Sequence, residues 1–170
     1  GKTISQTTKI TTINNFRSLD VSLNGQGAPL VPIGDLLLFP EHKYCVNLGG
    51  FANISIKTNE KIIAFDICPA NIVLNDICKE LGIEYDSNGD ISRKGKIVLT
   101  LLQQLNQLDF YIKKAPKSLA REWVEKYIFP ILKNHKPEDL LCTFCEHIAI
   151  QIGELLVDES VLFTGGGVFN

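Results

Sequence analysis

Residues 44–65, YCVNLGGFANISIKTNEKIIAF, decide the fold because they hold three strand-like runs joined by very short connections. The runs are YCVNL at 44–48, ANISIK at 52–57 and KIIAF at 61–65. The dipeptide Gly49-Gly50 is typical of a hairpin turn, and Asn59-Glu60 suits a second turn. Because neither connection is long enough to hold a helix, the segment predicts an antiparallel meander rather than parallel strands joined by crossovers.

Helical patterns surround this meander. After Asn71 the apolar residues recur at steps of three and four, which is the spacing of amphipathic helices. We expect helices over 71–82, 91–108, 119–132 and 137–156, and then a strand, 160–164, that leads into three glycines. Upstream we expect the end of a helix at 3–9, a short strand at 11–14 and a short helix within 29–39. The pattern as a whole predicts an α/β fold, with a sheet flanked by helices.

The segment FRSLDVSLNGQGAPLVP, residues 16–32, is the most informative for function. Its two glycines and two prolines predict an irregular loop instead of a regular helix, with the carboxylate of Asp20 at the entrance. Such a loop suits a site where a small molecule approaches the backbone and meets one base. An Asn-Gly turn between two surface elements explains the local residues equally well.

Composition narrows the function classes. The chain has 170 residues, 45% of them hydrophobic, and a formal charge of −2, so it is globular and lacks a basic field for nucleic acid or an anionic membrane. No apolar run approaches the roughly 18 residues of a membrane span, and the amino end does not resemble a signal peptide, so we expect a cytoplasmic protein. The sequence leaves the oligomeric state open, a homodimer included.

The five cysteines are odd in number and scattered, which favours reduced thiols over disulfides. Cys142 and Cys145 form a CxxC pair near His147, but a structural zinc usually needs a second such pair. We therefore expect both thiols on the buried face of a helix. None of the three histidines is expected to be catalytic.

Several blocks resemble the anhydro-N-acetylmuramic acid kinases. Residues 16–32 follow that family's pattern D-F-R-x-x-D-x-A-x-G-G-Q-G-A-P-L-V-P, and further likenesses are NLGGFANIS at 47–55, FDICPAN at 65–71, PKSLARE at 116–122 and TGGGVFN at 164–170. The resemblance covers essentially the whole chain. It implies an actin-like, hexokinase-like two-domain fold in which ATP lies between the lobes. Residues 1–40 would end the first lobe and residues 41–170 would form the second.

The resemblance also implies an activity and a set of roles. The family phosphorylates 1,6-anhydro-N-acetylmuramic acid, a product of peptidoglycan recycling, with ATP and Mg²⁺, and opens the anhydro bridge with water. Asp20 would be the general base that activates the water, and Asp66 would hold the Mg²⁺. The nucleotide would be bound by Gly49, Gly50, Asn53, Gly165, Gly166 and Gly167. The sugar would be bound by Arg17, Gly25, Gln26, Gly27, Asn71 and Lys117.

Each of these roles has a structural alternative. Gly49-Gly50 could be a plain hairpin, Gly165–Gly167 an exposed end, and Asp66 a cap on the helix that begins near residue 71. The segment PKSLARE could be the start of a surface helix, with Lys117 its member that faces the cleft. Asn24 stands where the family has glycine, a change that asparagine tolerates.

Cys68 and Ala70 stand where the family has glycines. An alternative function is therefore that of a kinase for another sugar. A second rival is a non-catalytic sugar-sensing module, because no first phosphate hairpin precedes these residues. Both ends of the sequence look cut, so we expect a fragment of a two-domain kinase that is inactive by itself.

Overall fold

The computed structural model describes residues 1–25, 27, 31–157 and 159–169. Its strands are β1 (Tyr44–Leu48), β2 (Phe51–Lys57), β3 (Ile62–Pro69) and β4 (Val161–Thr164). Its larger helices are α1 (Lys2–Thr8), α2 (Phe16–Ser22), α3 (Pro32–Leu38), α4 (Asn71–Glu80), α5 (Leu99–Asn106), α7 (Arg121–Tyr127) and α9 (Pro137–Gly153). Short helical turns are α6 (Asp109–Ile112), α8 (Phe129–Leu132), η1 (Ser87–Gly89), η2 (Ser92–Lys94) and η3 (Gly166–Phe169).

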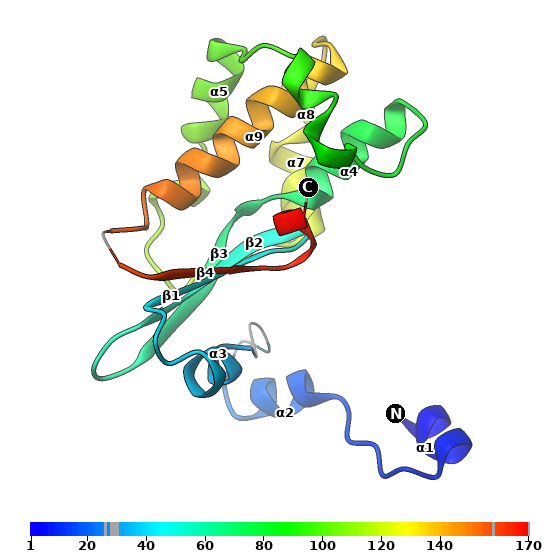
Figure 1. Ribbon diagram of the computed structural model, residues 1–170, viewed down its shortest axis with the longest axis vertical. Helices are drawn as coiled ribbons and strands as arrows, with labels where there is room; N and C mark the ends of the chain where they lie inside the picture. Colours follow the sequence, from blue (N-terminus) through cyan, green and yellow to red (C-terminus); the bar gives the residue numbers. More distant parts are fainter. Residues whose placement is uncertain (26, 28–30, 158, 170) are drawn as a thin grey trace.

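The sheet is mixed and has the strand order β3-β2-β1-β4. Strands β1, β2 and β3 form the predicted antiparallel meander, and β4 adds to β1 in parallel. Figure 1 shows α4, α5, α7, α8 and α9 on one side of the sheet and α3 on the other. The prediction of an α/β fold with a mixed sheet and flanking helices is therefore confirmed.

Two apolar clusters hold the helical layer together and fix it to the sheet. One is made by α4, α5, α7, α8 and α9 and includes the fully buried side chains of Leu101, Val124 and Phe144. The other joins the sheet to α9 through residues such as Val46, Ile54 and Ile152. Burial of each large apolar side chain contributes about 1.5–3 kcal/mol, so these clusters dominate the stability of the sheet and its helices.

The prediction of an irregular backbone for all of residues 16–32 is wrong at its start, because α2 covers Phe16–Ser22 and carries Asp20. The glycines and prolines of this segment all follow Ser22, so they end the helix without preventing it. The strand predicted at 11–14 is also absent: in this part of the described chain the backbone is irregular and lies outside the sheet.

The long helix predicted over 91–108 is shorter than expected. A Cβ on Gly95 would overlap the backbone of Glu138, so the chain passes very close to the start of α9 here. Residues 96 and 98 donate their backbone N–H groups to Asp139 and Thr143 of α9, which replaces helical hydrogen bonds, and α5 begins only at Leu99.

The helix predicted over 119–132 is divided into α7 and α8, with Pro130 in the first turn of the second, since proline has no N–H to continue the first helix. The helix predicted over 137–156 ends at Gly153. The prediction for α4 is confirmed, because Gly82 follows its end in the left-handed conformation (φ +74°) that terminates helices.

Candidate active site

A row of polar residues crosses the sheet on one face. Thr164 of β4 pairs with Asn47 of β1, Asn47 pairs with Asn53 of β2, and Asn53 pairs with Asp66 of β3. Residues directly opposite each other on neighbouring strands point to the same face of a sheet. A β-bulge between β2 and β3 leaves Ile67 without a partner and brings Asp66 opposite Asn53. All four side chains therefore lie side by side.

This polar row lines a cleft of about 560 Å³ between the sheet and α3. The cleft brings together five of the predicted site residues, Arg17, Gly49, Gly50, Asn53 and Asp66. Asp35 of α3 faces the same space, and its Oδ2 accepts a 2.6 Å hydrogen bond from the Ser55 hydroxyl of β2. The cleft is thus a polar, partly anionic surface, of a kind that holds a metal-bound or hydroxyl-rich ligand.

Asp66 is fixed by the backbone of a distant segment. Its Oδ2 accepts a 2.8 Å hydrogen bond from the N–H of Leu119, and its own N–H donates to the carbonyl of Lys117 at 3.0 Å. Burial raises the pKa of the Asp66 carboxyl, and the hydrogen bond from Leu119 opposes that rise. The alternative in which Asp66 caps α4 is wrong, because Ala70 occupies the N-cap and no side chain bonds the end of the helix.

Asp20 lies on α2, and its carboxylate is directed at the turn that follows. Its Oδ2 accepts a 2.6 Å hydrogen bond from the N–H of Gly27. A Cβ on Gly25 would overlap this carboxylate, and Gly27 adopts φ +71° with Val21 close by, so both glycines are needed for the observed turn. Asn24 has φ +66°, the left-handed conformation expected for an asparagine that replaces glycine.

The described residues that line the cleft include Arg17 but not Asp20, which follows it by one turn of α2. The roles of Asp20, Gly25 and Gly27 therefore stay predictions. Gln26 lies outside the described residues.

The two glycine turns meet beside Asn47. A Cβ on Gly165, which has φ +90°, would overlap Asn47 Oδ1 and lie 2.7 Å from the carbonyl oxygen of Leu48. On the other side, Asn47 Nδ2 lies 3.4 Å from the Cβ position of Gly49. Residues 166–169 then form η3, which contacts β1, although the side chains of Val168 and Phe169 are exposed.

The hairpin turn is also bonded to the start of α4. The carbonyl of Gly49 accepts from the N–H of Asn71, and the carbonyl of Gly50 accepts from the N–H groups of Ala70 and Ile72. The side chain of Asn71 donates a further 3.2 Å bond to the carbonyl of Leu48. With its carbonyls engaged on this side, the turn is held in one orientation.

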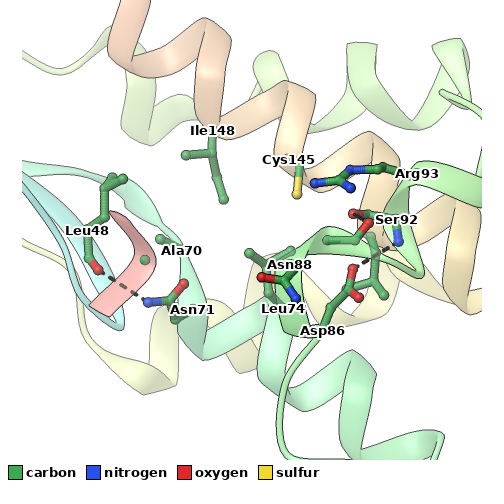
Figure 2. Close-up of a pocket in the computed structure, with 13 residues that line it drawn as sticks. Leu48, Ala70, Asn71, Leu74, Asp86, Asn88, Ser92, Arg93, Cys145 and Ile148 are labelled. Atoms are coloured by element: carbon green, nitrogen blue, oxygen red, sulfur yellow. Dashed lines mark hydrogen bonds between the residues drawn. The ribbon is translucent and has the colours of Figure 1, made fainter. Parts of the chain in front are cut away.

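A second cavity of about 240 Å³ lies next to Gly167 (Figure 2). Leu48 and Asn71 stand on one side of it, Cys145 and Ile148 project from α9, and Asn88 and Arg93 come from the turns η1 and η2. A neighbouring hollow of about 350 Å³ shares Asn71, Asn88 and Gly167 with it.

Asp86 fixes the wall that Asn88 and Arg93 form, because its buried carboxylate accepts hydrogen bonds from the N–H groups of Ile91 and Ser92 at 2.8 and 2.9 Å. The cavity thus combines apolar side chains with a few amide and guanidinium donors, as small-molecule pockets generally do.

The expectation that Cys142 and Cys145 are both buried is wrong: Cys145 is exposed and lines this cavity, and Cys142 is only half-buried. Desolvation by the surrounding protein raises the pKa of the Cys145 thiol to about 11. Among the described residues, no group of three histidine, cysteine or acidic side chains is arranged to hold a metal ion.

Lys117 is turned away from the cleft. Its ammonium donates to the backbone carbonyls of Phe110 and Tyr111 at 3.2 and 3.3 Å and lies 4.6 Å from the centre of the Phe110 ring. Burial lowers its pKa. Arg121, in the same sequence block, forms ion pairs with Asp76 and Glu125 on the helical surface, as the structural alternative for this block proposed.

His147 is fully buried in α9. Its Nε2 lies 2.8 Å from the Tyr111 hydroxyl and its Nδ1 lies 2.6 Å from Asn106 Oδ1, an oxygen that also accepts a bond from Gln151. Because the amide oxygen accepts from Nδ1, Nε2 is left to accept from the hydroxyl, and the ring is neutral. Burial lowers its pKa to about 4, which agrees with a structural role.

Sequence reasoning missed Asn47, Thr164, Asp35 and Ser55 as cleft residues. The two-residue period of the strands could have placed Asn47, Asn53 and Ser55 on one face, but the pairing of β4 with β1 has no local signal. The doubt about Cys68 and Ala70 is not supported by the backbone, because neither has a positive φ; both side chains are buried.

Comparisons with known proteins agree with the resemblance. The family model described as anhydro-N-acetylmuramic acid kinase matches residues 1–170. A protein of that name from Pseudomonas syringae pv. syringae (strain B728a) is 36% identical over 182 residues, which cover 98% of this chain and 50% of the relative. Another, from Bacillus cereus (strain 03BB102), is 32% identical over 188 residues, covering 98% of this chain and 49% of the relative.

The chain thus spans about half the length of the curated relatives that it matches. No helix in the described part of the chain is both long and apolar enough to cross a membrane. The match extends over every residue of the sequence, and on that basis the chain belongs to the anhydro-N-acetylmuramic acid kinase family.

Proposed function

We propose that the polypeptide containing these residues is an ATP-dependent kinase of cell-wall recycling. It converts 1,6-anhydro-N-acetylmuramic acid to N-acetylmuramic acid 6-phosphate, in the cytoplasm where ATP is available. The observation that carries this proposal is the meeting of the two glycine turns beside Asn47, at the end of a polar row that includes Asp66. Family membership supplies the substrate class.

The nucleotide would lie along the two glycine turns. Gly49 and Gly50 present backbone without side chains to the cleft, as phosphate-binding turns do, and Asn53 adds an amide beside them. The adenosine would occupy the cavity beside Gly167, where the apolar atoms of Leu74 and Ile148 face the ring and Asn88 offers an amide. This assigns Gly165–Gly167 and Asn71 to the adenosine end.

The residues of the cleft fit a Mg²⁺ ion bound with the nucleotide. Mg²⁺ prefers oxygen ligands and is commonly held by one or two carboxylates together with substrate phosphates. Asp66 offers one such carboxylate, with Oδ2 held by Leu119 and Oδ1 making no hydrogen bond to another described residue. The ion would neutralise the charge that develops on the transferred phosphoryl group.

Asp20 would act on the sugar. Its carboxylate takes a proton from a water molecule, whose oxygen forms a bond to the anomeric carbon. The bond from that carbon to O6 breaks, O6 bonds to the γ-phosphorus, and ADP leaves. The turn with Gly25 and Gly27 keeps the carboxylate oriented, and Arg17, on the same face of α2, reaches the cleft.

Residues 1–40 would belong to the junction with a first lobe and residues 41–170 to the second lobe of an actin-like fold. The apolar side chains of Ile13, Leu19 and Leu38 are 75%, 64% and 71% exposed, so α2 and its neighbours present a surface that a larger chain would cover. α3 connects this surface to the sheet through the bond between Asp35 and Ser55.

The test is phosphoryl transfer by the full-length protein to 1,6-anhydro-N-acetylmuramic acid and to a panel of free sugars. We expect turnover of the anhydro sugar, and Asp20→Asn should lower kcat by about 10²–10⁴-fold with unchanged ATP affinity. Glu60→Gln, in the exposed turn between β2 and β3, is the control. Turnover of a free hexose alone would refute the proposal in favour of a kinase for another sugar, and failure to bind Mg·ATP would favour a sensing module.

A further inference from the structure

We propose that Lys117 is a positioning residue for Asp66, holding the cleft carboxylate in place through the backbone of residues 117–119 without touching the ligand. This inference rests on the proposed function, because it gives Asp66 a ligand to meet. It replaces the expectation that Lys117 itself binds the sugar.

The first step is the attachment of Asp66 to the segment 117–119. This segment lies beside β3, an edge strand of the sheet. The carbonyl of Lys117 accepts a hydrogen bond from the backbone N–H of Asp66, and the N–H of Leu119 donates one to Asp66 Oδ2. The position of the carboxylate therefore depends on where this segment lies.

The second step is the attachment of the segment to the protein interior. The Lys117 ammonium bonds the carbonyls of Phe110 and Tyr111 in α6 and sits over the Phe110 ring. These carbonyls lie in a four-residue helix, and the carbonyl of Phe110 also accepts a 3.3 Å hydrogen bond from the N–H of Lys113. One side chain thus joins the segment to α6.

The third step is the rigidity of α6 itself. Phe110 is 3% exposed, and the Tyr111 hydroxyl is bonded to the fully buried His147, which is in turn bonded to Asn106 of α5. A continuous set of contacts therefore runs from the helical core through Tyr111 and Lys117 to the carboxylate in the cleft. Residues that orient a ligand-binding carboxylate in this way typically matter about 10–100-fold for affinity or activity.

The experiment is a double-mutant cycle on the full-length protein, with Mg·ATP affinity measured by calorimetry and protection of the Leu119 amide measured by hydrogen exchange. We expect Lys117→Met, which keeps the apolar stem, to weaken Mg·ATP binding about 10-fold and to expose the Leu119 amide. In the Asp66→Asn background the same substitution should have no further effect on affinity. Lys114→Met, at an exposed neighbouring lysine, is the control.

The possible results distinguish the metal-binding role of Asp66 from the positioning role of Lys117. If Asp66→Asn binds Mg·ATP as tightly as the unaltered protein, the metal role of Asp66 in the proposed function fails, and the role of Lys117 fails with it. If Asp66→Asn is impaired but Lys117→Met adds its full effect to it, or leaves the Leu119 amide protected, only the positioning role of Lys117 is overturned. Lys117→Ala, which also removes the apolar stem, should weaken Mg·ATP binding at least as much as Lys117→Met does.

Discussion

Replacement of Gly165 by alanine should damage the nucleotide site, whereas the same change at Gly153, at the end of α9, should not. Gly165 has φ +90°, a conformation that costs a residue with a side chain about 1–3 kcal/mol. Its Cβ would also lie 2.7 Å from the carbonyl oxygen of Leu48, which is backbone and cannot rotate away. Steric overlap of this kind costs a further ~1–3 kcal/mol.

The two effects together amount to about 2–6 kcal/mol if the turn keeps its place, a large part of the ~5–15 kcal/mol that stabilises a domain. If the turn moves instead, the cost in stability is smaller but the contact between Gly165 and Asn47 is lost. Gly153 is the matched control, since its Cβ would have no heavy atom within 4 Å and its φ is not positive.

Urea unfolding and calorimetric Mg·ATP titration of both variants measure the two quantities. We expect Gly165→Ala to unfold at lower urea, to bind Mg·ATP at least about 10-fold more weakly, or both. Gly153→Ala should bind Mg·ATP as the unaltered protein does and should unfold at no lower urea concentration. Equal stability and equal affinity for the two variants would refute the argument that the turn is held against β1.

Three further predictions concern other parts of the site and its supporting core. Gly25→Ala should lower kcat because its Cβ would displace the Asp20 carboxylate, whereas Gly34→Ala, in open space within α3, should leave steady-state kinetics unchanged. The pKa of His147 is about 4 in the folded protein and near 6.5 in an unfolded chain, so the unfolded state binds more protons between these values. Stability should therefore fall by about 2 kcal/mol as pH drops from 7 toward 4.5, and urea unfolding of His147→Gln should show a weaker dependence; equal slopes would contradict this. ATP should slow maleimide labelling of Cys145, followed by mass spectrometry, and an unchanged rate at saturating ATP would exclude the cavity beside it as the adenosine site.

Strands β1 and β2 could be predicted almost to the residue because their information is local, whereas β3 continues to Pro69, beyond its predicted end at residue 65. Polar and apolar residues alternate from Asn53 to Lys57, and Gly49-Gly50 favours a tight connection between β1 and β2. The error at α2 came from the same kind of reasoning, applied too widely: glycine and proline determine the backbone where they stand, and they do not prevent a helix that ends before them.

The parts that could not be predicted depend on contacts between distant segments. The bond from Leu119 to Asp66 and the bonds from Lys117 to α6 link residues whose sequence neighbours give no sign of the partner. Cys145 shows the same limit, because helical periodicity groups the residues of a face but does not say which face meets the core. The glycines were assigned through resemblance, and the structure supplies the physical reason for Gly165, whose missing side chain makes room for Asn47.

The hydrogen bonds between the hairpin carbonyls and the first amides of α4 have a mechanical consequence. Three N–H groups of residues 70–72 are bonded to the turn at Gly49 and Gly50, so the turn and the helix form a single stiff body. If a bound phosphate displaces the turn, α4 moves with it, and so do the helices that pack on α4. Domain closure around a nucleotide would then occur as a rotation of this whole body, with the flexing confined to the segments that connect it to the rest of the polypeptide.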